Sequence, residues 1–483
     1  MSTSELPVAG YSVSPGGLSS TSASFIDELA LDPRFQELQT TLRTYLIDEV
    51  RSAENTRQQS PDVAIESSED VQGHELFMQH MLKSQDRIPL MKKVKYLTVW
   101  ISECAPWLDM FDQERHFGIQ VPLLAQRSPA VFFALLALAA RQVERKSSSK
   151  VSIHDSLELY SLAIESLATS INATDPEALV TACILCVLEM MSVSPRDWRR
   201  HLEGCAGLFQ HLGVNGFSGG VWQAVFWCYA RMDVCAAIIA DGAESTTLPL
   251  QKWVSLDAMT TPDVDQQVHI NHAFLEKGIE TSDMYANYAV YLCARVCDLL
   301  AKRTRHLELA EKNGCSDAPF QKTWFEIRED LQQWFDRRPP EMLSVEEVDR
   351  SPETEYFPRI LFAHSAAISG NQLYHTACIL MSEIQPSQVD DGILGDSHTI
   401  FWHARRVVGI SLTNPHRGCL NNAIQPLYVA GKVFTHRDEH KIIIGLLHHI
   451  ETCSGWGSKW RIKDLEHFWG YSPGRSISLV RSC

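Results

Sequence analysis

Residues 194–240 form the stretch that most constrains the fold of this chain. Its first half places apolar side chains on one face of an amphipathic helix, at Trp198, Leu202, Cys205, Phe209 and Leu212. Ser194, Pro195 and Asp197 predict a capping box at the start of this helix, and Gly213 predicts a left-handed cap at its end. Residues 222–240 are apolar on nearly every side. They therefore predict a buried central helix, which other helices must surround.

Two glycines lie inside the first of these helices, Gly204 and Gly207. Each costs about 1 kcal/mol of helix stability relative to alanine. We expect that a second helix approaches closely at this point, because glycine leaves room for a neighbouring helix. The alternative is a locally weak turn without a close neighbour.

The predicted central helix carries two charged residues, Arg231 and Asp233. Residues two apart face different ways on a helix, so the two charges cannot simply satisfy each other. A buried charge needs a partner, and each is therefore expected to pair with another element. Glu189 and Glu203 are the candidates for a structural ion pair with Arg231. A ligand site or a catalytic dyad remains the alternative.

The rest of the chain is a succession of helical patterns. Core stripes are predicted in two N-terminal helices, at Phe35, Leu38, Leu42, Leu46 and Val50, and at Leu90, Val94, Leu97 and Ile101. Residues 356–384 are predicted as one long helix. Strand-like alternation is absent nearly everywhere, and no period of 20–50 residues repeats. The predicted fold is therefore all-α, a large irregular multi-helix domain.

The chain divides into four predicted segments. Residues 1–24 are rich in Ser, Gly and Pro and predict a disordered tail. Residues 25–53 predict a loosely attached N-terminal helix, and residues 54–87 a polar linker with a short helix. Residues 88–483 predict the all-helical domain.

Charge and composition exclude several functions. The net charge is −16, and no long segment offers the basic face that phosphate binding requires. The short basic runs at 92–95 and 303–305 are interpreted as solvated helix faces. No apolar run reaches the roughly 20 residues of a membrane span, and residues 1–24 lack the pattern of a secretory signal. Thirteen cysteines, mostly within apolar helical patterns, indicate free thiols in a reducing compartment. We therefore expect an intracellular protein that does not contact a membrane.

Several motifs occur in the order found in one protein family. The run Trp198-x-x-His201-Leu202-Glu203-Gly204, followed by Trp222 and Arg231-Met232-Asp233, resembles the regulatory region of fungal binuclear zinc-cluster transcription factors, the fungal-specific transcription factor domain. Further similar runs are Trp107–Asp112, Val121–Ala125, Ser128-Pro129, Phe132–Ala140, the helix after Asp175-Pro176 with Glu189, Pro426-Leu-x-x-Ala430-Gly431, Gly455-Trp456 and Trp469. The resemblance covers roughly Ile88 to Gly470. It implies a non-enzymatic regulator of RNA polymerase II transcription in the nucleus.

The DNA-binding part of the resembled family is missing from this sequence. That part is a basic stretch of six cysteines beginning C-x2-C-x6-C, whereas the first cysteine here is Cys104. No DNA-contacting or metal-ligating residue can therefore be carried over, and no direct DNA binding is expected from this chain alone. DNA contact is expected through a protein partner, either a DNA-binding transcription factor or a homo- or heterodimer, or through a zinc cluster in a missing exon.

Two patterns contain the residue types of a metal site. Cys183-x2-Cys186-x14-His201-x3-Cys205 has a zinc-like spacing, but both of its first cysteines lie on the apolar face of a predicted helix, which favours core thiols. The pair Cys293 and Cys297 is interpreted in the same way. No catalytic, cofactor-binding, metal-binding or DNA-binding residue is therefore assigned, and no cofactor is expected.

The second pattern is the acidic run that starts at Asp390-Asp391. It is similar to the aspartate-rich motif of helical terpene cyclases, but it reads DDxxL rather than DDxxD and is interpreted as a solvated loop. A metal-dependent helical enzyme remains the alternative function, and a non-catalytic helical scaffold is a third possibility. An enzyme would place Asp390 and Asp391 in a deep apolar cavity.

Overall fold

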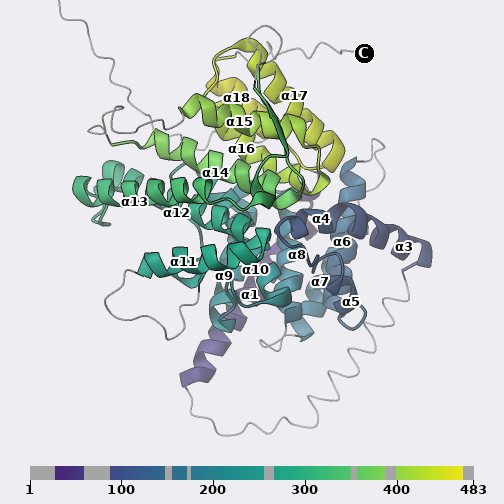
Figure 1. Cartoon of the computed structure of the whole chain (residues 1–483). Coiled ribbons are helices and arrows are strands. Elements are labelled where there is room, and N and C mark those ends of the chain that lie inside the picture. The colour runs from purple at the N-terminus through teal and green to yellow at the C-terminus, as the bar shows by residue number, and fades with distance from the viewer. Residues whose placement is uncertain are drawn as a thin grey trace, which may run out of the picture.

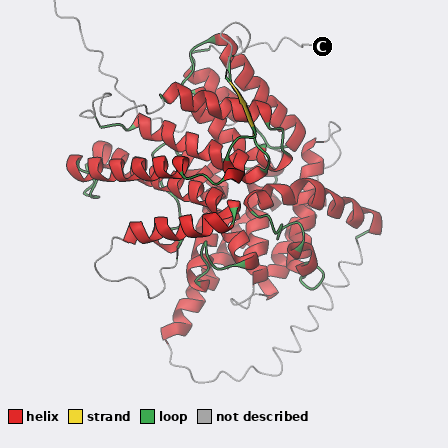
Figure 2. Cartoon of the chain, in the orientation of Figure 1, coloured by secondary structure: helices red, strands yellow, loops and turns green. Residues whose placement is uncertain are grey.

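A computed structural model describes residues 28–58, 88–146, 155–170, 176–254, 266–349, 356–386 and 399–471. In this part of the chain the predicted all-α architecture is confirmed, with a two-stranded sheet as the exception (Figure 2). The first half of the described chain contributes α1 (Pro33–Gln58), α3 (Leu90–Val99), α4 (Ala105–Leu108), α5 (Gln120–Leu124), α6 (Pro129–Lys146), α7 (Asp155–Ser170), α8 (Pro176–Ser192), α9 (Pro195–Leu212) and α10 (Gly220–Ile239).

The second half contributes α11 (Gln266–Glu280), α12 (Ser282–Leu309), α13 (Asp317–Asp336), α14 (Ser365–Glu383), α15 (Ile400–Thr413), α16 (Ile424–Gly431), α17 (Arg437–Ser454) and α18 (Lys459–Phe468). The strands are β1 (Glu346–Val348) and β2 (Arg359–Leu361). Short 3-10 turns cover Glu28–Leu31, Asp109–Phe111, Leu250–Lys252, Pro340–Met342, Arg417–Cys419 and Asn421–Ala423, and Trp100–Cys104 is a π-helical turn between α3 and α4.

Helix α10 is the buried central helix that its apolar sequence predicts. It packs against α8 and α9 on one side and against α12 and α16 on the other. Helix α12 continues the packing outward, because it contacts α11, α13 and α14 (Figure 1). In Figure 1 the C-terminal helices α15–α18 lie above α10 and α12 and the N-terminal helices α6–α8 to their right, and α17 contacts α6.

Both ends of α9 agree with the prediction, although the start differs in detail. Ser194 is the N-cap, but its hydroxyl donates to the Asp197 carboxylate at 2.7 Å instead of accepting a backbone N–H. The reciprocal capping box is therefore not formed. Gly213 ends the helix with a φ of 67°, the left-handed conformation that glycine adopts without strain.

The N-terminal helix α1 is not loosely attached, which corrects the prediction from sequence. It packs against α9 and α7, and Phe35 and Leu42 are completely buried. Its described backbone also continues to Gln58, beyond the predicted end at residue 53. The close helix approach predicted at Gly204 is confirmed, because a Cβ atom at Gly204 would lie 2.9 Å from the Cβ of Leu46. The apolar stripe of α1 thus completes the domain core.

Of the predicted core stripe of α3, only Leu97 packs against the core, where it is partly buried. Leu90 is 73% exposed, and Val94 and Ile101 are also exposed, whereas Tyr96 and Trp100 are buried. Tyr96 donates a hydrogen bond to Asp155 at the start of α7, and Trp100 donates to the carbonyl of Phe117. The aromatic residues have larger surfaces to bury and polar atoms with buried partners. They therefore determine which face of α3 packs inward.

Residues 356–384 are not one helix as predicted. They contain β2, which pairs antiparallel with β1, and only then α14, which begins at Ser365. Pro358 disfavours helical conformation in the preceding residue. The backbone groups on the outer edge of β2 form hydrogen bonds with the end of α15. The N–H of Ile360 donates to the Thr413 hydroxyl, and the Asn414 amide donates to the carbonyl of Ile360. The strand is thus stabilised by tertiary contacts.

None of the helices in the described ranges combines the length and the apolar character that crossing a membrane requires.

Candidate functional site: a cavity beside Arg231

A cavity of about 110 Å³ lies against the central helix α10. One face of α10, from Cys228 to Ile239, forms its longest wall. Four tryptophans from four different segments line it as well, namely Trp107, Trp198, Trp456 and Trp460. Amide side chains contribute polar groups, namely Gln372, Asn421, Asn422 and Gln425. The cavity is therefore enclosed by both halves of the chain.

Arg231 is the cationic residue of this cavity. Its Nη2 donates to the carbonyl oxygen of Leu108 at 2.6 Å, and its guanidinium carbon lies 5.3 Å from the ring centre of Phe111. Neither Glu189 nor Glu203 pairs with it, so the predicted ion pair is wrong. Glu189 is bonded elsewhere, and Glu203 is exposed on the outer face of α9. The partners of Arg231 precede it by more than 100 residues, a distance over which helix periodicity carries no information.

Asp233 points away from Arg231, as the helix geometry predicts, and binds backbone amides. The N–H groups of Thr247 and Leu248 donate to its carboxylate at 2.8–3.1 Å, and Tyr229 donates at 3.1 Å. Burial raises the pKa of Asp233, whereas these backbone hydrogen bonds lower it. Asp233 thus anchors the segment after α10 and has a structural role.

A buried polar network joins α7, α8 and α9 next to the cavity. Tyr160 donates to the Glu189 carboxylate at 2.6 Å, and Nδ1 of His201 lies 2.9 Å from the same oxygen. Burial alone lowers the pKa of His201, but the Glu189 and Cys205 groups beside it raise the pKa to about 10. His201 is therefore protonated at neutral pH. The histidine of the Trp-x-x-His motif holds three helices together through a buried ion pair.

The zinc-like cysteine spacing does not form a metal site in the described ranges. They contain no group of three or more His, Cys, Asp or Glu side chains that could hold a metal ion. The thiol of Cys183 hydrogen-bonds with that of Cys228 on α10, and burial also raises its pKa well above the ordinary value. Cys293 and Cys297 hydrogen-bond with each other within α12. These thiols pack in the helical core, as the interpretation from sequence favoured.

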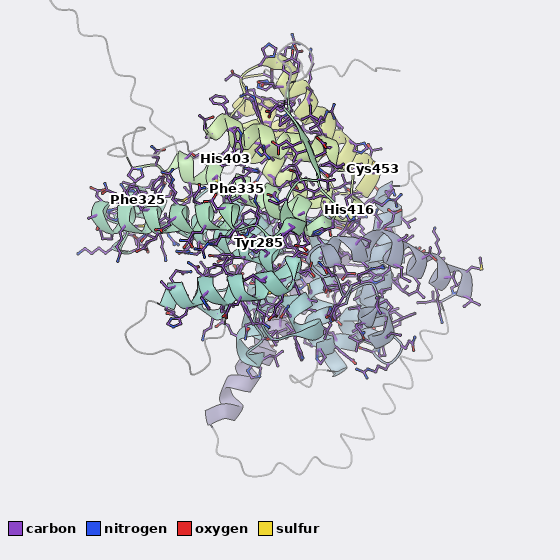
Figure 3. The ribbon with its side chains drawn as sticks, viewed as in Figure 1. Tyr285, Phe325, Phe335, His403, His416 and Cys453 are labelled. Carbon is purple, nitrogen blue, oxygen red and sulfur yellow. The ribbon has the colours of Figure 1, made fainter. Side chains whose placement is uncertain are left out.

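A second buried polar cluster lies where α13, α14 and α15 meet. The Nδ1 atoms of His375 and His403 are 2.9 Å apart, and the rings of Phe335, Tyr374 and Trp402 surround them. Figure 3 shows Phe335 and His403 close together at this junction. These residues are distant in sequence, so the sequence analysis did not identify the cluster.

The aspartate-rich run at Asp390, Asp391 and Asp396 lies outside the described residues. The structure therefore does not test the enzyme alternative. The sequence analysis also missed the amide residues of the cavity. No motif distinguishes Gln372 or Gln425 from other helical glutamines, and only the packing of α16 against α10 and of α14 against α12 and α16 brings them to the cavity.

The comparisons with known proteins point to one family. Residues 95–470 match the family described as "Fungal specific transcription factor domain". A curated relative, the "Transcription activator AMTR1" of Alternaria alternata, is 22% identical over 507 aligned residues. The alignment covers 80% of this chain and 64% of that relative, so the chain spans less than two thirds of the relative's length. No solved structure matches the chain.

Proposed function

Because the chain belongs to the fungal specific transcription factor domain family, we propose that it regulates RNA polymerase II transcription in the nucleus without contacting DNA by itself. The family match over residues 95–470 is the observation that carries this proposal, and it makes the chain a transcriptional regulator. The name of the curated relative supports the same role. Both point to a regulator that is not an enzyme.

The charge of the chain supports an indirect contact with DNA. Fifty-nine acidic residues outnumber 43 basic ones, and a net charge of −16 repels a phosphate backbone. Several arginines of the described ranges are also engaged in ion pairs, for example Arg295 with Asp330 and Arg406 with Glu347. We propose that the contact is made by a DNA-binding partner protein, which the chain joins alone or as a homo- or heterodimer, or by a zinc cluster beyond these 483 residues.

A tethering experiment tests the regulatory role. The full chain is fused to an unrelated DNA-binding domain in a fungal host whose reporter carries the matching binding site. We expect reporter transcription to change at least several-fold relative to the DNA-binding domain alone. A fluorescent fusion of the chain without that domain is expected to accumulate in the nucleus. An unchanged reporter together with exclusion from the nucleus would contradict the proposal.

A further inference from the structure

The cavity beside α10 holds a positive charge that no described carboxylate contacts directly. Arg231 is only 8% exposed. Among the described residues it makes one hydrogen bond, which it donates to the carbonyl oxygen of Leu108. No described carboxylate lies within ion-pair distance of its guanidinium. Asp283 is close enough for Arg231 to lower its pKa, although burial raises that pKa to about 6, but no ion pair joins the two side chains. A buried cation without an ionic partner is costly, and a bound anion would remove that cost.

A second polar group in the cavity is also free to donate. Nε of Arg461 donates to Oε1 of Gln425 at 2.9 Å, which fixes the orientation of the Gln425 amide. The amide N–H groups of Gln425 have no partner among the described residues. Arg461 is held in turn by stacking on Tyr428 and Trp460, with its guanidinium carbon 3.7 Å and 4.3 Å from the two ring centres. The donor is thus pre-oriented before any ligand arrives.

The remaining walls are suited to an apolar body. Val187, Val234, Ile238 and Val290 line the cavity together with the indole rings. Its volume of about 110 Å³ is below the ~150 Å³ of a protein cavity that accepts benzene. A compact aliphatic group fits this space. A small inorganic anion would leave the apolar walls without contacts.

We propose that this cavity binds a small monocarboxylate with a short or branched aliphatic chain, whose carboxylate meets Arg231 and the Gln425 amide. Such a ligand would be the effector of the regulator, and this part of the inference rests on the proposed function. The ligand would contact α8 and α9 from the first half of the chain and α14 and α16 from the second half. Occupancy would therefore stabilise the packing of the two halves by mass action.

Binding to the purified full chain is the direct test. Isothermal titration and thermal melting are measured with propanoate and with propanamide, which has nearly the same shape but no charge. We expect the acid to bind and raise the melting temperature, and the amide to bind at least tenfold more weakly. Phenylacetate, whose aromatic ring alone needs more than this volume, should bind more weakly than propanoate. Equal binding of acid and amide, or no binding of either, would overturn the proposal.

Variants locate the binding site. Arg231→Met keeps an unbranched side chain, removes the guanidinium and should reduce acid affinity at least tenfold. Lys322→Met removes an exposed charge from α13 and should leave the affinity unchanged. Leu373→Trp fills the cavity from its half-buried edge and should abolish binding while Arg231 stays in place. If Arg231→Met does not fold, the Leu373→Trp variant and the comparison of acid with amide still test whether the carboxylate binds in this cavity. Unchanged affinity in the folded variants would contradict the site.

The tethered reporter separates this inference from the proposed function. Acid binding without any reporter change would retain the cavity as a carboxylate site and contradict its role as an effector site. Reporter activity without acid binding would retain the regulatory role and contradict the ligand.

Discussion

At the scale of single residues, the buried pair of His201 and Glu189 should make stability depend on pH. The folded-state pKa of His201 is about 10, above its ordinary value of 6.5. The stabilisation from its charge is therefore fully present below pH 6.5 and is lost as the pH rises through about 10. Denaturant unfolding between pH 6 and pH 10 should show this loss. A free energy of unfolding that is flat over this range would contradict a protonated His201.

Substitution of this pair provides a second residue-scale prediction. His201→Leu leaves Glu189 buried without its cation, and we expect a loss of roughly 3–5 kcal/mol in the free energy of unfolding. The double variant His201→Leu/Glu189→Leu removes both charges and should recover part of that loss. Glu203→Gln, at an exposed position of the same helix, is the matched control and should change stability by less than about 0.5 kcal/mol. A double variant less stable than His201→Leu would contradict a charge-based role.

At the scale of elements, the contact between α1 and α9 predicts a reversal of sign. A methyl group at Gly204 would lie 2.9 Å from Leu46, so Gly204→Ala should destabilise the folded protein by about 1–3 kcal/mol. In a Leu46→Ala background the obstruction is removed, and the same change should stabilise α9 by up to about 1 kcal/mol. A double-mutant cycle monitored by thermal unfolding tests this. Gly204→Ala effects of the same sign in both backgrounds would show that α1 does not pack there in solution.

The inward face of α3 is a second prediction at this scale. Leu90→Ser and Val94→Ser change exposed side chains and should each alter stability by less than about 0.5 kcal/mol. Trp100→Ala removes a fully buried indole that donates to the Phe117 carbonyl, and should cost about 3–5 kcal/mol. Chemical denaturation of the three variants gives the comparison. Large losses of stability in the Leu90 and Val94 variants would show that these side chains pack inward, as their spacing predicts.

At the scale of the whole molecule, the charge of the chain predicts its behaviour toward DNA. A net charge of −16 makes even the non-specific electrostatic attraction unfavourable. A gel-shift assay with the pure chain at physiological salt should show no sequence-specific complex at nanomolar protein. Adding the DNA-binding partner should produce one that contains both proteins. A zinc-independent, sequence-dependent shift by the chain alone would reveal a DNA-binding surface in these 483 residues.

Several elements follow from chemistry that is local in the sequence. The apolar spacing of α9, the all-round apolar character of α10 and the cap at Gly213 each depend on residues within a few turns of one another. Helix periodicity reports such local relations directly. The glycines inside α9 favoured a close neighbour at Gly204 over a locally weak turn, but they did not identify that neighbour as Leu46 of α1.

Which distant groups meet depends on the packing of the whole chain. Arg231 bonds to the carbonyl of Leu108, a partner that no side-chain pattern could identify, because every residue carries the same backbone oxygen. The face of α3 that packs inward depends on what Tyr96 and Trp100 contact in other segments. The cavity likewise requires Gln425 to reach the wall of α10 through the packing of α16. An apolar pattern in the sequence indicates that a helix face is covered. Which of many similar apolar faces covers it depends on the packing of the whole chain.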